Sequence, residues 1–373
     1  MIPKLRIPGN VTPGRGRPGR SGSTAVSVMW AACAFACAWT GASAAARGSA
    51  AEPPFSLETS YVMAAVPPGP YSDYLAFDPQ GGRLFATPQA AKAVAVIDIK
   101  NGRVVKMISG IGNSHGIYFS APLKRLFVAD GASGDVKVFS GDSYELIKTI
   151  PLAKGADWLT YDPATKCIYV NNGGDDAGMD HALVSAVDTE AMVKVADIPI
   201  ASPALEASVI DPATGRLYVN LVDDGKIAVV DLARKTVTAT WALTKGRRNM
   251  AITLDAPHKR LYVVTRDSPM HGSLIAVDTE SGHETATLPI GGWADSISLD
   301  ERRQRIYVST GVGHLETFAI EPHDTYRPLP ALDTAVMAKT GLYSREMDRM
   351  YVSVPHLGGT PAQIMVFAPT DYR

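Results

Sequence analysis

The sequence predicts an all-β fold, a seven-bladed β-propeller of four-stranded blades whose ring is closed by an N-terminal strand. A short β-rich strand headed by a basic residue recurs along the 373 residues, at intervals of 41 to 50 residues. A turn precedes each copy and a third strand follows it. Repeats of this length, with up to four strands in each, are typical of propeller blades.

The second strand of each unit carries the repeat most clearly, because its letters change least from copy to copy. The seven copies read RLFAT at Arg83, RLFVA at Arg125, KCIYV at Lys166, RLYVN at Arg216, RLYVV at Arg260, RIYVS at Arg305 and RMYVS at Arg349. The wide interval in the third unit accommodates an extended loop, NNGGDDAGMDH. Seven copies therefore predict seven blades.

Turns and further strands complete each unit. Asp78-Pro79 is the first of several Asp-Pro turns, in which the carboxylate accepts backbone N–H groups and proline fixes φ. Third strands are expected at places such as 94–98 and 227–231, and fourth strands at places such as 104–108. We interpret the repeated Asp and Arg residues as structural.

The ends of the chain predict how the ring closes. The seventh copy stops after its third strand, at 363–367, and so lacks an outer strand. The segment 56–66 precedes the first blade and has strand character, with Leu57, Tyr61 and Val62. We expect this segment to be the outer strand of the last blade, and a mobile leader is the alternative.

The first residues indicate export. Residues 1–20 are basic and contain no acid, residues 25–46 are mainly apolar, and this run ends in small residues. This pattern predicts a signal peptide over 1–46, cleaved near 44–46, a short leader over 47–55, and one propeller over 56–373. The protein is then periplasmic or secreted, without a membrane span in the mature chain. An uncleaved N-terminal anchor is the alternative.

The composition of the mature chain bears on partners. Five of the 36 basic residues and none of the 37 acidic residues precede Ala46, which leaves 31 basic against 37 acidic residues, a net charge of −6. This charge argues against nucleic-acid binding, which needs a basic surface. Cys167 is then the only cysteine, so no intramolecular disulfide is possible, and its place in a strand predicts a buried, inert thiol.

Ionisable residues recur five positions before the turn residue of each unit. Six of the seven residues in this register are ionisable, and all seven fall where the innermost strands begin, at the mouth of the central channel. They are Asp73, His115, Asp157, Glu206, Met250, Asp295 and Lys339. Carboxylates brought together need a cation or a basic partner. We predict one divalent cation held by Asp73, His115, Asp157, Glu206 and Asp295, with oxygen ligands favouring Ca²⁺ or Mg²⁺ and His115 admitting Zn²⁺ or Mn²⁺. A solvated polar rim is the alternative.

Other residues on the same face are candidate contacts for a small ligand. Trp158 and Trp293 stand beside two of the acids, and Arg248 and Asn249 stand where blade five begins. With Lys339, these residues form the predicted ligand-binding set. Four further histidines, His181, His271, His314 and His356, fall in loops of this face. The sequence contains no nucleotide-binding loop, haem attachment or flavin motif.

The R-[LI]-[YF]-V strand followed by a V-x-V-[IV]-D strand resembles the YVTN repeat family, the group that includes YncE-like periplasmic proteins. The resemblance covers about 57–370 and implies the propeller fold. Propellers of this kind serve many activities, so the resemblance does not choose among them.

Three functions follow as hypotheses. The first is binding of a small molecule, metal or protein at the top of the channel by a monomeric propeller. The second is a metal-assisted hydrolase or lyase, lactonase-like, in which a carboxylate or His115 moves the proton. The third, nucleic-acid binding, is known among YncE-like relatives and is disfavoured here by charge.

Overall fold

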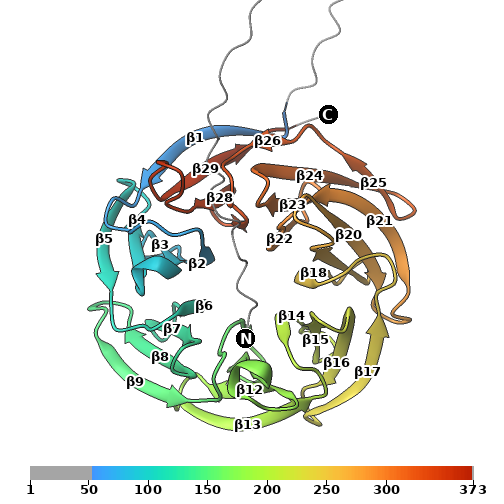
Figure 1. The fold of residues 1–373 in the computed structure, drawn as a ribbon, viewed down its shortest axis with the longest axis horizontal. Coiled ribbons are helices and arrows are strands. Elements are labelled where there is room, and N and C mark those ends of the chain that lie inside the picture. The colour runs from blue at the N-terminus through green and yellow to red at the C-terminus, as the bar shows by residue number, and fades with distance from the viewer. Residues whose placement is uncertain (1–52, 372–373) are drawn as a thin grey trace, which may run out of the picture. The chain divides into compact units, whose positions relative to one another are not determined.

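Seven antiparallel β-sheets follow one another in sequence order around a central axis (Figure 1). The computed structural model describes residues 53–371. The predicted signal peptide, 1–46, lies outside the described residues. The predicted seven-bladed β-propeller is confirmed.

Each blade runs from an innermost strand outward to an edge strand. Blades one to three are β2(Ser72–Asp78), β3(Arg83–Pro88), β4(Val94–Asp98) and β5(Arg103–Ile108); β6(Ser114–Ser120), β7(Arg125–Asp130), β8(Asp135–Ser140) and β9(Leu146–Pro151); and β10(Leu159–Asp162), β11(Cys167–Gly173), β12(Ala182–Asp188) and β13(Val193–Ile200). Blades four and five are β14(Leu205–Asp211), β15(Arg216–Leu221), β16(Lys226–Asp231) and β17(Thr236–Ala242); and β18(Asn249–Asp255), β19(Arg260–Thr265), β20(His271–Asp278) and β21(Glu284–Gly291).

The last two blades depart from the simple four-strand order. Blade six is β22(Ser296–Asp300), β23(Arg305–Thr310) and β24(His314–Glu321), with β25(Thr325–Pro328) and β26(Leu332–Asp333) both paired to β24. Blade seven is β27(Thr340–Ser344), β28(Arg349–Val354), β29(Gln363–Pro369) and β1(Phe55–Val62). Two short 3-10 helices, η1(Gln89–Ala91) and η2(Gly174–Ala177), lie in the loops of blades one and three.

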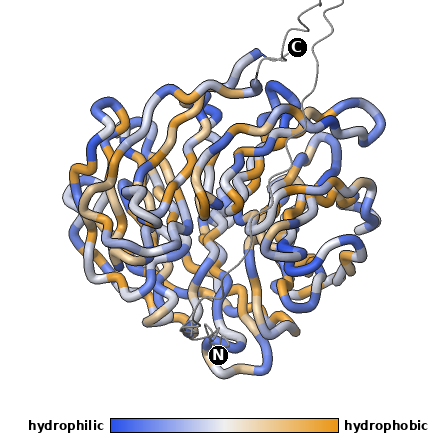
Figure 2. The backbone as a smooth tube through the Cα atoms, turned by 45° about the horizontal axis from the view of Figure 1, so that its top comes forward, coloured by the Kyte–Doolittle hydropathy of each residue, from blue (hydrophilic) through white to orange (hydrophobic). Residues whose placement is uncertain are grey.

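Blades pack face to face through their middle strands, and hydrophobic stretches follow the strands (Figure 2). In β15, Leu217 joins the cluster shared with blade three, whereas the next residue, Tyr218, joins the cluster shared with blade five. Both faces of these strands are therefore buried, which explains why the second and third strands read as nearly continuous apolar runs.

The predicted turns form as expected. The Asp78 carboxylate accepts a hydrogen bond of 2.9 Å from the backbone N–H of Gly81, and Asp300 accepts one of 3.1 Å from that of Arg303. The residue just before each second strand has a left-handed φ, between 47° and 66°. These residues are Gly82, Lys124, Lys166, Gly215, Lys259, Gln304 and Asp348.

This conformation corrects one detail of the repeat. Cys167, not Lys166, pairs with the turn residue Asp162, as Arg83 pairs with Asp78 in blade one. Lys166 occupies the left-handed position before the strand. The third copy therefore reads CIYVN from Cys167, and Cys167 is buried at the position of the usual basic residue.

An N-terminal strand closes the ring, as predicted. β1 pairs antiparallel with β29 from Phe55 opposite Pro369 to Val62 opposite Gln363. Phe55, one residue before the predicted start, is fully buried against Tyr307 of blade six. The last blade is thus shared between the two ends of the described chain, and this contact links it to blade six.

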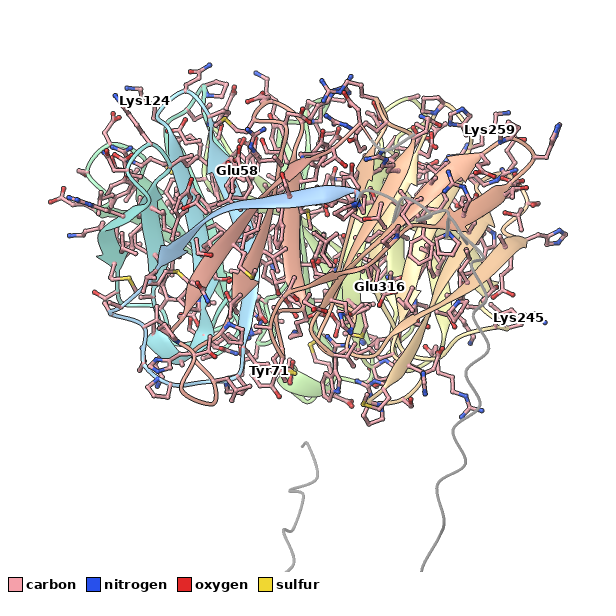
Figure 3. The ribbon with its side chains drawn as sticks, turned by 90° about the horizontal axis from the view of Figure 1, so that it is seen from above. Glu58, Tyr71, Lys124, Lys245, Lys259 and Glu316 are labelled. Atoms are coloured by element: carbon pink, nitrogen blue, oxygen red, sulfur yellow. The ribbon has the colours of Figure 1, made fainter. Side chains whose placement is uncertain are left out.

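The strand directions define two faces. Innermost strands begin on the face that carries Tyr71 and Lys245, which is drawn at the bottom of Figure 3 and is called the top face below. Lys124 and Lys259 lie on the opposite face. No helix within 53–371 is long and apolar enough to span a membrane.

Candidate functional site

The seven residues of the predicted register lie in irregular backbone, at or just before the start of their innermost strands. The pairing of the first and second strands slips between Ser72 and Leu75, so that Asp73 lies in a β-bulge. The same slip occurs around His115, Glu206 and Met250. Asp157, Asp295 and Lys339 lie just before their innermost strands begin. Bulges at a rim turn side chains out of the regular alternation, and residues that precede a strand are not bound by that alternation, so this position is able to face the channel.

The first half of the site centres on His115. Its Nδ1 lies 2.8 Å from Oδ2 of Asp73 and 3.5 Å from Oδ1 of Asp157. Its Nε2 lies 2.6 Å from the side-chain nitrogen of Asn113. The Gln89 side chain donates to the same oxygen of Asp73. Both ring nitrogens of His115 therefore have polar neighbours, which hold the imidazole in one orientation.

The second half of the site centres on Asp295. Both Lys339 and Arg266 form ion pairs with its carboxylate. The Lys339 ammonium also lies 3.9 Å from Oδ1 of Asp73, which links the two halves. Lys339 is only 5% exposed, so its charge depends on these acids. The Arg266 guanidinium lies 5.1 Å from the ring centre of Trp293.

Contacts run without a break from Asp157 through His115, Asp73, Lys339 and Asp295 to Arg266. These six residues and Glu206 are called the channel-mouth ring below. Each of the seven blades contributes one of these residues. In blade five the residue at the predicted register position is the buried Met250, and Arg266 belongs to the ring in its place. Acidic and basic side chains alternate along the contacts, so the protein itself supplies most of the neutralising charge.

Glu206 differs from the other acids of the ring. No hydrogen bond or ion pair of its carboxyl group is found among the described residues, whereas its backbone oxygen accepts a hydrogen bond from the Asn171 amide. Burial, followed by the charges of Asp157 and Asp295, raises the pKa of Glu206 well above its usual range. Glu206 is thus the acid of the ring that no described basic side chain contacts directly, although the charges of Arg266 and Lys339 oppose the rise in its pKa.

The pKa directions reflect the same arrangement. Burial alone would lower the pKa of His115, but the carboxylates of Asp157 and Asp73 outweigh it and raise that pKa to about 9. Burial also raises the pKa of Asp157, and His115 opposes that rise. For Asp295, burial is outweighed by Lys339 and Arg266, so its pKa is lowered. The two carboxylates therefore favour the protonated form of the His115 imidazole.

A small cavity lies along the innermost strands next to the ring. Its volume is about 90 Å³, and its lining residues include Asp73, Tyr74, Trp158 and Asp295. The rings of Tyr74 and Trp158 meet edge to face with centres 5.2 Å apart. The Tyr74 hydroxyl donates to Asp157 over 2.8 Å. A cavity with room for a small ligand thus lies beside the charged groups.

The predicted ligand-binding residues divide between two places. Trp158 lines the cavity and Trp293 packs under Arg266, both near the ring. Arg248 is exposed in a separate open groove of about 800 Å³ between blades four and five, 3.6 Å from Asp223. Asn249 is fully buried and donates to Asn220, where it joins blades four and five.

The remaining candidates lie apart from the ring. His181 contacts Asp180 at 2.7 Å, His314 contacts Asp333 at 3.3 Å, and His356 lies 2.9 Å from the backbone oxygen of Val66. Asp180 and Val66 lie in loops, whereas Asp333 is the last residue of β26. Within residues 53–371, no three His, Cys, Asp or Glu side chains are grouped as ligands for a metal ion.

Four residues of the site escaped the sequence analysis: Arg266, Tyr74, Gln89 and Asn113. Arg266 follows the second strand of blade five, outside the register that the repeat defines. Tyr74 stands beside Asp73 in the same bulge, so a search of both bulge residues in each blade would have found it.

Comparison with known proteins supports the fold. No protein-family model matches the sequence, and no curated protein matches it. Among solved structures, the chain is similar to a chain of hydrazine synthase from Kuenenia stuttgartiensis, with a TM-score of 0.69 and 15% sequence identity. The match covers 80% of this chain and 95% of that one. At this identity, the likeness shows a shared propeller architecture and nothing about activity.

Proposed function

We propose that this propeller binds a small ligand at the top of its central channel. The observation that carries the proposal is the channel-mouth ring, in which seven ionisable side chains from the seven blades meet beside a cavity of about 90 Å³. Burying so many ionisable groups has a high free-energy cost, which structural packing alone does not require. Perturbed groups that converge beside a cavity are typical of binding and catalytic sites.

A ligand screen tests this proposal directly. Purified protein is screened by thermal shift against small cations, anions, neutral polar molecules and divalent metals, and hits are compared with the Asp73→Asn variant. Ligands of the ring should raise the melting temperature of the wild type and lose that effect in the variant. A complete screen without any ring-dependent hit would contradict the proposal.

A divalent cation remains a second candidate ligand, because four carboxyl groups and His115 share one small region. Metal-assisted hydrolysis or elimination would follow from such an ion, with a carboxylate or His115 moving the proton. Metal analysis of the purified protein tests this candidate. Membership of the YVTN repeat family, export through residues 1–46 and a monomeric state also stay predictions.

A further inference from the structure

We propose that the cavity beside the channel-mouth ring takes up a compact, uncharged apolar group of the ligand, such as a short branched alkyl group. This inference rests on the proposed function, since it names the apolar part of a molecule whose polar part meets the ring. The place of the cavity in the channel, the hydrogen bonds of its polar walls and its size lead to it.

The cavity lies along the innermost strands, just past the ring. Its lining starts at two residues of the ring, Asp73 and Asp295, and continues along the strands β2 and β22 (Figure 1). Strands β18 and β27 of blades five and seven supply further walls, and Trp158 of blade three completes the lining. Because these strands begin on the top face, the ring forms the end of the cavity nearest to that face.

Small residues leave this part of the channel open. In blades one and three, the residue just after the register position is a large aromatic one, Tyr74 or Trp158. In blades five, six and seven the equivalent residues are small, and they are Ala251, Ser296 and Thr340. At the next position of blade seven, Gly341, a Cβ atom would clash with the Ser309 hydroxyl, so no side chain fits there. The aromatic side chains thus fill one part of the channel, and the small residues leave space next to it.

Every polar side chain in the lining already has a partner within the protein. The carboxylates of Asp73 and Asp295 pair with basic groups of the ring. The other polar side chains donate hydrogen bonds to protein oxygens, and these donors are Tyr74, Trp158, Ser296 and Thr340. Among the described residues, no buried polar atom without a partner belongs to this lining. A buried water molecule needs two to four polar partners, so the cavity offers water few unused ones.

The remaining walls and the volume favour a compact apolar group. The apolar side chains of the lining are Leu75, Ala251, Ile252, Ile297 and Leu342. Moving an alkyl group from water into such surroundings is favourable, whereas a charged group would lose its hydration without gaining a free partner. A cavity of about 150 Å³ holds benzene, with its six carbon atoms, so about 90 Å³ has room for roughly three or four carbon atoms.

The first experiment uses the wild-type protein with xenon as the probe, because xenon is uncharged and enters dry apolar cavities. NMR of labelled isoleucine methyl groups should show saturable shifts of Ile252 and Ile297, which line the cavity. Ile97, fully buried in the cluster between blades one and seven, is the internal control, and helium at the same pressure controls for compression. Unmoved Ile252 and Ile297, or an equal shift of Ile97, would show that the cavity does not take an apolar guest.

The second experiment uses matched variants. Ala251→Val adds methyl groups to the cavity wall and should weaken xenon binding by about tenfold or more, because it fills part of the space. Ala207→Val makes the same change at the equivalent position of blade four, which is also 2% exposed but lies outside the lining, and should leave xenon binding unchanged. Unchanged binding in Ala251→Val would overturn the proposal, and so would an equal loss in Ala207→Val.

A third variant keeps the test open if Ala251→Val does not fold. Leu342→Ala enlarges the cavity and should let the protein bind benzene, which is too large for the wild-type cavity. Leu299→Ala shortens a leucine of the innermost strand β22 outside the lining and should not bind benzene. Absence of benzene binding in folded Leu342→Ala, or equal binding in Leu299→Ala, would contradict the proposal.

The ligand screen separates this inference from the proposed function. Isobutyramide, isobutyrate and isopropylammonium, which carry a short branched alkyl group on a neutral, an anionic and a cationic head, are added to it. Those that bind in a ring-dependent way should displace xenon from Ile252 and Ile297. If ring-dependent ligands are found but xenon does not bind, or is not displaced, this inference alone is wrong. If xenon binds and the complete screen finds no ring-dependent ligand, the proposed function is wrong, and the cavity does not form one site with the ring.

Discussion

The hydroxyl of Tyr74 donates a hydrogen bond of 2.8 Å to the carboxylate of Asp157, across 83 residues of sequence. Tyr74 belongs to the innermost strand of blade one, and Asp157 precedes that of blade three. The contact therefore crosses the channel mouth past blade two, whose His115 lies 3.5 Å from the same carboxylate oxygen. The contacts among the ring residues run between blades, and Gln89 and Asn113 add contacts within blades one and two.

Tyr74→Phe should lower the free energy of unfolding by about 1–3 kcal/mol, because a buried carboxylate oxygen loses a donor. Chemical denaturation measures this difference. Tyr144→Phe is the matched control, since the described structure shows no hydrogen bond of the Tyr144 hydroxyl and its ring packs against the cluster of blades one and two. Equal losses in both variants would show that the Tyr74 hydroxyl contributes nothing specific.

Closure of the propeller by β1 gives the second prediction. Phe55→Ala should destabilise the protein by about 3–5 kcal/mol, since Phe55 is fully buried between Tyr307 and Phe367 and its loss leaves a cavity. Leu57→Ala in the same strand is the control, because Leu57 is 52% exposed and its loss should cost little. A small effect of Phe55→Ala would mean that β1 is not essential for closure.

The repeat predicts the fold well because the residues that define each blade lie close together in the sequence. The turn Asp, the left-handed residue and the two-faced apolar strand all lie within about ten residues of one another. Counting five positions back from the turn also locates the ring, since the bulge recurs at the same register around Asp73 and His115.

Contacts between blades are harder to predict from sequence. Arg266 reaches Asp295 of the next blade from outside the register, so no repeat marks it. Asn249 looks like a ligand contact because it stands beside Arg248, yet its amide joins two blades. Whether a long side chain turns inward or outward depends on neighbours that are distant in sequence.

Protonation of His115 gives a prediction about pH. Its pKa is about 9 in the folded protein and about 6.5 when unfolded, so the folded state holds this proton more tightly. The stabilising contribution is complete below pH 6.5 and is lost as pH rises through 9, with a size on the order of 3 kcal/mol. Between these values the wild type should lose stability more steeply than His115→Asn.

Unfolding free energies from pH 6 to 9.5 measure this difference in slope. His181→Asn changes a histidine of the same face outside the ring and should follow the wild-type slope. Parallel curves for the wild type and His115→Asn would show that the two carboxylates do not hold the imidazole in its charged form.

Two isosteric changes in the ring should have opposite effects on stability. Asp295→Asn leaves the buried Lys339 and the half-buried Arg266 without their shared carboxylate, and breaking such a pair costs about 3–5 kcal/mol. Asp157→Asn removes a carboxylate whose pKa is already raised by burial, and the Asn oxygen still accepts from Tyr74. Without a bound metal, this variant should be as stable as the wild type or slightly more stable.

A divalent cation at the channel mouth would change the second result. Asp157→Asn would then lower metal content and melting temperature together, because an ion that binds only the folded state stabilises it by mass action. EDTA should reproduce this loss in the wild type and add nothing in the variant. If EDTA leaves the melting temperature unchanged, no metal is found in the purified protein, and Asp157→Asn is not destabilised, then His115, Lys339 and Arg266 are the cations that balance the ring.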